Sequence, residues 1–182
     1  MDKIKVHDKI FRPYIRYEEF SKDIDRVAAQ LNADFKDSGE VPILLCILNG
    51  SVMFTGELMQ RLDFPMELAS IKVSSYMGTQ STGIVELRQP LTCDVKDRTV
   101  IIVEDIVDTG YTIELLKSFL REKGAKETRV CTLFFKDESY QFTGRIKIDY
   151  VARHIQNQFI VGFGLDYNEQ GRNSRDIYIL DE

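Results

Sequence analysis

Three carboxylates lie close together in the stretch from Val100 to Thr112. Glu104 and Asp105 directly follow four apolar β-branched residues, a run typical of a strand buried in a parallel sheet. Asp108 comes three positions later and begins a short polar loop. Ionised carboxylates only accept hydrogen bonds, so a metal ion, sugar hydroxyls or a proton to be moved would suit them as partners.

The loop Asp108-Thr109-Gly110-Tyr111-Thr112 has the features of an anion site. Helical spacing follows it, through Ile113, Leu116 and Leu120. A strand, a glycine-containing loop and a helix N-terminus together present backbone N–H groups and the positive end of the helix dipole. The hydroxyls of Thr109 and Thr112 add donors. The sequence therefore predicts a phosphate cradle directly beside the carboxylates.

An acid pair at a strand end is, in isolation, more often a solvated turn than a site. The apolar run before it, the third acid and the phosphate-suited loop favour a site here. Adjacent strand residues point to opposite faces, so Glu104 and Asp105 share one site only if the strand twists or ends there. The G-x-x-x-x-G-K-[ST] loop and a G-x-G-x-x-G after a strand are both absent from the sequence.

Strands and helices alternate along the chain, which predicts an α/β sheet that is parallel at its centre. The expected elements are a helix over about 17–38, a strand over 43–48, a helix through Met53, Leu58 and Leu62, a strand over 66–76, a strand over 99–105 with a helix to about 123, strands over 128–135, near 148–152 and over 158–163, and an edge strand at Ile177 and Ile179. Ligands of such sheets bind outside the carboxyl ends of the strands. Four polar clusters fall at those ends: Asn49-Gly50, Glu104-Asp105, Lys136 and Asp166.

The segment from Tyr76 to Gly83 interrupts this pattern with small and polar residues. It suits a mobile lid, and it equally suits a long hairpin turn between residues 68–75 and 84–88.

Composition excludes several classes of protein. The chain has 182 residues, 43% of them hydrophobic, and a net charge of −5, which has the wrong sign for binding nucleic acid or an anionic membrane. Its three scattered cysteines match neither a disulfide framework nor a zinc site and favour a reducing, cytoplasmic location. The polar start excludes a signal peptide, and no apolar run is long enough to span a membrane. His7 and His154 are expected to be structural or surface residues.

The stretch Val100–Thr112 resembles the phosphoribosyl-pyrophosphate (PRPP) signature of the type I phosphoribosyltransferases. Leu48-Asn49-Gly50-Ser51 matches the pyrophosphate loop of that family, and Ser74-Ser75-Tyr76 with Ser81-Thr82-Gly83 matches its lid. The segments 133–136 and 159–169, followed by Arg172, are similar to the branch that acts on 6-oxopurines, the hypoxanthine(-guanine) phosphoribosyltransferases. The resemblance covers most of the chain.

The resemblance implies a fold and a domain organisation. The fold would be a central, mostly parallel twisted sheet flanked by helices, with a small hood and a flexible lid. Residues 1–182 would form one domain, with the hood made by the N-terminal segment and roughly 137–182, and the lid by about 74–84.

The resemblance also implies a role for each matching residue. The implied roles are: Asp108 as general base; Glu104 and Asp105 on the ribose hydroxyls; Asp108, Thr109, Gly110, Tyr111 and Thr112 on the 5′-phosphate; Asn49, Gly50 and Arg172 on pyrophosphate; Lys136, Phe159, Ile160 and Asp166 on the purine; Ser75 and Tyr76 in the lid; and Glu104, Asp105 and Asp166 on Mg²⁺. Taken alone, Lys136 equally fits a surface lysine, whereas Phe159 is by default a core residue and Asp166 by default part of a turn.

The implied reaction is Mg²⁺-dependent transfer of the 5-phosphoribosyl group from PRPP to hypoxanthine or guanine, giving IMP or GMP and pyrophosphate in purine salvage. The implied partners are these small molecules and further copies of the chain in a homodimer or homotetramer. Two positions depart from the family: Asn49 and Tyr111 stand where lysine is frequent. Preference among hypoxanthine, guanine and xanthine is left open.

Two other functions account for part of this pattern. A non-catalytic, nucleotide-sensing regulator on the same fold would need a basic face, which a net charge of −5 disfavours. A response-regulator receiver also places an acid pair after one strand and a lysine after another. It would need an isolated phospho-acceptor Asp after a third strand and would have no use for the Asp-Thr-Gly-Tyr-Thr loop.

Overall fold

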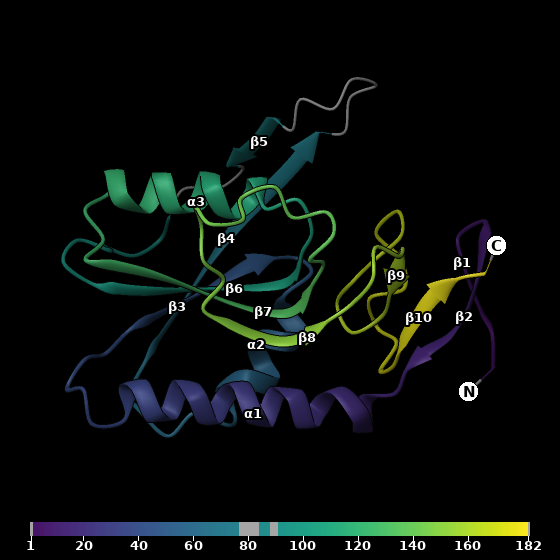
Figure 1. Cartoon of the computed structure of the whole chain (residues 1–182), viewed down its shortest axis with the longest axis horizontal. Helices are drawn as coiled ribbons and strands as arrows, with labels where there is room; N and C mark the ends of the chain where they lie inside the picture. Colours follow the sequence, from purple (N-terminus) through teal and green to yellow (C-terminus); the bar gives the residue numbers. More distant parts are fainter. Residues whose placement is uncertain (1, 77–83, 88–90, 182) are drawn as a thin grey trace.

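The computed structural model describes residues 2–76, 84–87 and 91–181, and two sheets organise them (Figure 1). The larger sheet has six strands, in the order β5-β4-β3-β6-β7-β8. Their bounds are β3 Ile43–Leu48, β4 Glu67–Tyr76, β5 Ile84–Leu87, β6 Thr99–Val107, β7 Glu127–Phe135 and β8 Tyr150–His154. Only β5 is antiparallel to its neighbour, so the carboxyl ends of the other strands meet at one edge.

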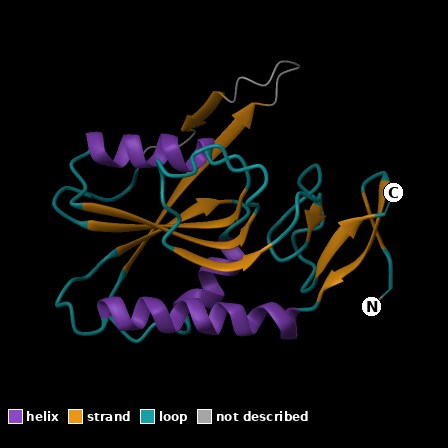
Figure 2. Ribbon diagram, viewed as in Figure 1, coloured by secondary structure: helices purple, strands orange, loops and turns teal. Residues whose placement is uncertain are grey.

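Helices cover both faces of this sheet (Figure 2). Helices α1 (Tyr17–Phe35) and α2 (Val52–Met59) pack with one set of β6 residues, Ile101 and Val103. Helix α3 (Tyr111–Glu122) packs with the alternate set, Val100 and Ile102. Because successive strand residues point to opposite faces, the continuous apolar run at the start of β6 serves both cores. The expected α/β fold, with a mostly parallel sheet flanked by helices, is confirmed.

A second sheet joins the two ends of the described chain. It is antiparallel and contains β1 (Ile4–Val6), β2 (Lys9–Ile15), β10 (Ile177–Leu180) and β9 (Ile160–Val161) in that order. Figure 1 shows it beside the carboxyl edge of the larger sheet. The expected hood and domain boundaries stay a prediction.

Two expectations about strands are corrected by this second sheet. The strand expected over 158–163 is reduced to Ile160–Val161 and belongs to the second sheet. The segment at Ile177 and Ile179 is a strand, but it lies between β2 and β9 and is therefore not at an edge. Ile177 is fully buried because it belongs to the same hydrophobic core as the buried face of α1.

The segment from Tyr76 to Gly83 was expected to be either a lid or the turn of a hairpin. Strands β4 and β5 on either side of it pair as antiparallel neighbours, with Tyr76 opposite Ile84. Residues 77–83 lie outside the described residues, as do the side chains of Ser75 and Tyr76. The lid stays a prediction.

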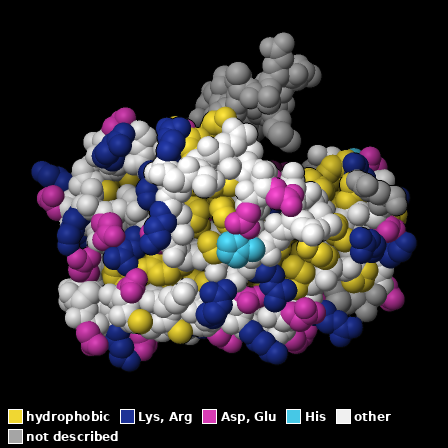
Figure 3. All heavy atoms as spheres, viewed as in Figure 1, with side chains coloured by type: hydrophobic (Ala, Val, Ile, Leu, Met, Phe, Trp, Pro, Cys, Tyr) yellow, Lys and Arg dark blue, Asp and Glu magenta, His cyan; other side chains and the backbone are white. Residues whose placement is uncertain are grey.

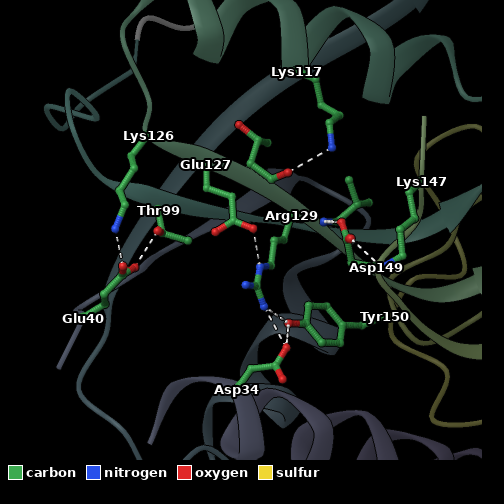
Figure 4. Close-up of polar contacts among 12 residues, drawn as sticks. Asp34, Glu40, Thr99, Lys117, Lys126, Glu127, Arg129, Lys147, Asp149 and Tyr150 are labelled. Carbon is green, nitrogen blue, oxygen red and sulfur yellow. Dashed lines mark hydrogen bonds and ion pairs between the residues drawn. The ribbon is translucent and has the colours of Figure 1, made fainter. Parts of the chain in front are cut away.

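A polar network connects the amino ends of the strands to α1 and the loop after it (Figure 4). Arg129 donates to Asp34 at 2.7 Å and to Glu127 at 2.8 Å, and the Tyr150 hydroxyl donates to the same Asp34 carboxylate. Glu40 accepts from Thr99 at 2.6 Å and from Lys126. These contacts fasten the edge of the sheet opposite the polar clusters.

The viewed surface carries charges of both signs side by side (Figure 3). Within the described ranges, no helix has the length and apolar character needed to cross a membrane.

Phe11 should be a main source of stability in the second sheet. It is fully buried with Val6 and Val161, whereas its neighbour Ile10 is 41% exposed. We expect Phe11→Ala to lower the free energy of unfolding by about 3 kcal/mol or more, because it leaves a cavity. The matched Ile10→Ala should cost about 0.5 kcal/mol or less. Urea unfolding of both variants measures the difference, and equal losses would contradict this account of the core.

Candidate functional site

One cavity of about 900 Å³ opens at the carboxyl ends of the parallel strands. Its described lining combines β3, β4, β6 and the residue after β7 with the segments around β9. The residues lining it are Ile47, Leu48, Asn49, Gly50, Lys72, Val73, Glu104, Asp105, Ile106, Asp108, Thr112, Lys136, Gln158, Phe159, Ile160, Leu165, Asp166, Asn168, Glu169 and Arg172. All four polar clusters predicted at strand ends therefore meet in one place.

Glu104 and Asp105 both line this cavity although they are neighbours in a strand. Strand β6 pairs with β3 only as far as Val103, so the carboxyl end of β6 has β7 alone as a neighbour. Each acid is only 8% exposed. Strand β6 continues to Val107, so it does not end at the acid pair; it only loses β3 as a neighbour after Val103.

The loop after β3 approaches Asp105 very closely. A Cβ added at Gly50 would lie 1.8 Å from Oδ2 of Asp105. Asp105 itself is oriented by its Oδ1, which accepts the backbone N–H of Ile106 at 2.8 Å. Only glycine allows the backbone of the loop to lie against the carboxylate.

Asp108 is held by two donors that contact different oxygens. Lys136 donates to Oδ2 at 2.7 Å, and the Ser139 hydroxyl donates to Oδ1. The Lys136 ammonium also lies 3.3 Å from Oδ1 of Asn157. The lysine reaches this place because its backbone N–H donates to Val107 at the end of β6. Lys136 is thus a buried cation facing the cavity rather than a surface lysine.

The loop from Asp108 to Thr112 is packed more than it is exposed to the cavity. Thr112 lines the cavity, while Thr109, Gly110 and Tyr111 are not among its described lining. Gly110 has a φ of 91°, and a Cβ there would lie 2.4 Å from the ring of Tyr140. Gly110 caps α3 without a side-chain hydrogen bond, so no side chain satisfies the N–H groups of the first helical turn there.

The segment after β9 brings a cation and two acids to the opposite wall. Arg172 Nη2 forms an ion pair with Asp166 at 2.8 Å and donates to Glu169 at 2.7 Å, while Nη1 donates to the Gly164 carbonyl at 2.8 Å. Asp166 in turn accepts the backbone N–H of Glu169 at 2.8 Å. The arginine fork is thus oriented by three acceptors.

Phe159 and Ile160 form the apolar part of the wall. Phe159 is 47% exposed, so its default assignment to the core is wrong. Its ring lies 6.2 Å from that of Phe11 and 5.8 Å from that of Tyr167, measured between centroids. Supported from behind in this way, the ring leaves surface available to a planar ligand.

Four polar residues of the lining were not predicted from the sequence to be part of the site. They are Lys72, Gln158, Asn168 and Glu169. Lys72 faces the cavity because β4 pairs with β3 in the register that sets it opposite Leu48. Glu169 is placed by a tight turn in which both Asn168 and Glu169 have positive φ. Neither register nor turn geometry has a local signal strong enough to predict these positions.

Charge in the cavity is unevenly balanced. Five lining carboxylates (Glu104, Asp105, Asp108, Asp166 and Glu169) face three cations (Lys72, Lys136 and Arg172).

Burial raises the pKa of Glu104 well above its ordinary range, and the neighbouring charge of Asp105 raises it further. Burial also raises the pKa of Asp105. Contact with Arg172 lowers the pKa of Glu169. A cation or hydroxyl donors beside the acid pair would favour its ionised forms.

The acid pair suits a cation that is shared with a ligand. Within the described ranges, no group of three or more His, Cys, Asp or Glu side chains is arranged to enclose a metal ion. Oε2 of Glu104 is buried and has no hydrogen-bond partner. Mg²⁺ commonly uses only one or two carboxylates and takes its other ligands from water and substrate phosphates. The residues present fit that kind of site.

The buried Glu104 should make stability depend on pH. When the pH is well below 4.5, the ordinary pKa of the side chain, Glu104 is protonated in both the folded and the unfolded chain. Above that pH the unfolded chain ionises first, because the folded pKa is raised, and stability is lost until the folded pKa is reached.

Glu104→Gln removes this penalty. We expect a higher Tm than wild type at pH 7, by roughly 2–4 °C for each kcal/mol of relieved charge burial. The gain should shrink towards zero below about pH 4, where both states are protonated. Thermal unfolding of both proteins across this pH range measures it, and a gain that is equal at all pH values would rule out charge burial as the cause.

Comparison with known proteins gives a consistent result. A family model described as the phosphoribosyl transferase domain matches residues 15–168. A hypoxanthine-guanine phosphoribosyltransferase of Streptococcus pneumoniae is 37% identical over 178 residues, which cover 97% of each chain. A hypoxanthine-guanine-xanthine phosphoribosyltransferase of Tritrichomonas foetus is 34% identical over 185 residues, which cover 100% of this chain and 98% of the relative.

A solved structure supports the same relationship. The crystal structure of a hypoxanthine phosphoribosyltransferase from Staphylococcus aureus superposes with a TM-score of 0.85 at 32% identity. The match covers 93% of this chain and 91% of that one. Family model, relatives and structure agree over nearly the whole chain: the protein belongs to the phosphoribosyltransferase family and has the type I fold.

Proposed function

We propose that the protein transfers the 5-phosphoribosyl group of PRPP to a 6-oxopurine, hypoxanthine or guanine, and so forms IMP or GMP and pyrophosphate in purine salvage. The observation that carries the proposal is the meeting, in one cavity, of the acid pair, Asp108, Lys136 and Phe159. The relatives named as hypoxanthine-guanine phosphoribosyltransferases support it.

The ends of PRPP would bind on different elements. The 5′-phosphate would bind the backbone N–H groups of residues 108–112 and the hydroxyls of Thr109 and Thr112, where α3 lacks a side-chain cap. The ribose hydroxyls would donate to Glu104, whose Oε2 has no partner, and to Asp105.

Pyrophosphate would bind at the opposite wall. Gly50 would contribute its backbone, which lies beside Asp105, and Asn49 would contribute a neutral side chain. Arg172 would contribute an oriented guanidinium group, whose geometry suits phosphate oxygens. Mg²⁺, held by Glu104, Asp105 and Asp166, would neutralise charge that develops on the departing pyrophosphate. Because Asn49 is uncharged, the charges near this end come from Arg172 and Lys72, both of which line the cavity.

The purine would lie between the exposed face of Phe159 and the ribose. Lys136 would donate to its 6-oxo group, which selects against a 6-amino group because an ammonium has only donors. The backbone at Ile160 would contact the ring edge, and Asp166 would lie close by. Choice among hypoxanthine, guanine and xanthine depends on contacts with the 2-position of the ring.

Asp108 would act as the general base. Its carboxylate lies 2.7 Å from Lys136, so a purine whose oxygen bonds the lysine would bring its N7 near the same carboxylate. As the N9–C1′ bond forms and pyrophosphate leaves, Asp108 would accept the N7 proton. Ser75 and Tyr76 of the expected lid would exclude water from the oxocarbenium-like transition state.

We further propose a cytoplasmic location and a homodimer or homotetramer. The oligomer is testable by sedimentation. No observation on the described residues favours the non-catalytic regulator.

The function is tested by incubating the protein with PRPP, Mg²⁺ and one base at a time, and measuring pyrophosphate release. We expect release with hypoxanthine or guanine and none with adenine. Omission of Mg²⁺ should abolish the signal. No release with any 6-oxopurine, xanthine included, would contradict the proposal and favour the regulator.

Asp108→Asn tests the proposed base. The amide keeps the shape of the carboxylate but cannot accept the proton. We expect turnover to fall by about 10²–10⁴-fold, the usual contribution of a positioned base, while PRPP still binds. Steady-state kinetics with isothermal titration of PRPP measures both effects. Turnover like that of wild type would remove Asp108 from this role.

Gly50→Ala tests the proposed pyrophosphate loop. The new Cβ would lie 1.8 Å from Oδ2 of Asp105, so either the loop or the carboxylate must move. A displacement of about 1 Å typically lowers catalysis about 10²-fold, which we expect in kcat/KM for PRPP.

Gly56→Ala in α2 is the matched control, since nothing lies within 4 Å of the added Cβ. It should leave kcat/KM unchanged and raise the free energy of unfolding by about 0.5–1 kcal/mol. Equal activity of the two variants would show that the close approach at Gly50 is irrelevant to catalysis.

A further inference from the structure

A short segment after β7, Ser139–Phe142, packs directly on the loop that begins with Asp108. Its contacts are: Ser139 hydroxyl to Asp108; Gln141 backbone N–H to the Thr109 carbonyl at 3.1 Å; Tyr111 hydroxyl to the Gln141 side chain at 2.8 Å; the Tyr140 ring over Gly110; and the Tyr111 and Phe142 rings edge to face at 5.3 Å. We name this segment the brace. Every residue of the loop from Asp108 to Tyr111 is contacted by it.

The brace is itself well anchored. The Tyr140 hydroxyl donates to the Ile146 carbonyl at 2.8 Å, and the Tyr140 ring packs on Phe135 at 5.0 Å between centroids. Phe142 is only 4% exposed. Ser139 therefore presents its hydroxyl from a fixed backbone.

The two donors on Asp108 differ in what they must do during the proposed reaction. Lys136 has a flexible stem and a second acceptor, Asn157, at 3.3 Å. If Lys136 donates to the purine oxygen, its bond to Oδ2 of Asp108 is weakened at the moment that oxygen must accept the N7 proton. Ser139, on Oδ1, has no such conflicting task.

We propose that Ser139 is a positioning residue for phosphoribosyl transfer: its hydroxyl, held by the brace, keeps the Asp108 carboxylate turned towards the base when Lys136 engages the substrate. This inference rests on the proposed function, because it assigns Ser139 a task within that reaction. The carboxylate torsion of Asp is broad and poorly defined by its own rotamer preference. With Oδ1 bonded, Oδ2 is the oxygen left to face the cavity.

Removal of the hydroxyl should therefore affect turnover more than binding. We expect Ser139→Ala to lower kcat roughly tenfold or more, since a hydrogen bond to a charged group is lost. KM for PRPP should stay within about twofold, because the phosphate and ribose contacts are untouched. Ser139→Thr, which keeps the hydroxyl, should restore most of the turnover. Glu138→Gln, an exposed neighbour in the same loop, is the control and should behave like wild type.

A double-mutant cycle separates positioning from a merely structural effect. If Ser139 acts through Asp108, then Ser139→Ala should have little further effect in the Asp108→Asn background, where the base is already lost. A similar further loss of kcat in that background would overturn the proposal. So would unchanged kcat in the single variant, or a loss confined to KM.

A second measurement does not depend on activity. Crystal structures of wild type and Ser139→Ala should show the Asp108 carboxylate in one orientation in the first and rotated or in several orientations in the second. An identical carboxylate in both would overturn the positioning role. If wild type itself releases no pyrophosphate with any 6-oxopurine, the proposed function fails, while these structures still decide whether Ser139 orients Asp108.

Discussion

The burial of two adjacent carboxylates at the end of β6 is the constraint on which the site depends. Glu104 and Asp105 are each 8% exposed, and one oxygen of Glu104 has no partner. Burying charge is unfavourable unless it is paired, so burial raises the pKa of both carboxyl groups, and a ligand with hydroxyls or a cation would favour their ionised forms. The burial of this pair therefore lowers the stability of the folded protein, and it places two groups that can bind a cation or hydroxyls. The apolar residues that precede the pair, buried on both faces of the sheet, hold the end of β6 in position.

Close backbone packing lets the remaining parts converge on that pair. The loop after β3 touches Asp105 through Gly50, and the loop after β6 lies under Tyr140 at Gly110. Both glycines are used where a side chain would keep two pieces of chain apart. The cavity lining therefore combines closely packed backbone at Gly50 with side chains such as Lys136 and Phe159.

The fold and the centre of the site could be predicted because their signals are local. The apolar run of β6, the acids after it and the Asp-Thr-Gly-Tyr-Thr loop are contiguous, and β3 is an equally uniform apolar run. Residues placed by long-range pairing could not be predicted: Lys72 depends on the register of β4 with β3, and Ser139 on the packing of the brace. Strand β2 was missed because it contains Pro13, which normally argues against an inner strand. Its neighbour β1 pairs only as far as Phe11, so Pro13 has no partner on that side.

The second sheet has a consequence for the order in which the protein assembles. Strand β10 pairs with β2 across more than 160 positions of chain, from Ile177 back to Ile15. Contacts of such long sequence separation form late, because much loop-closure entropy must first be lost. Phe159, which lines the cavity, rests on Phe11 of β2, so this part of the cavity depends on the second sheet. The part of the cavity lined by Phe159 is therefore expected to be completed late in folding, when β10 has joined β2.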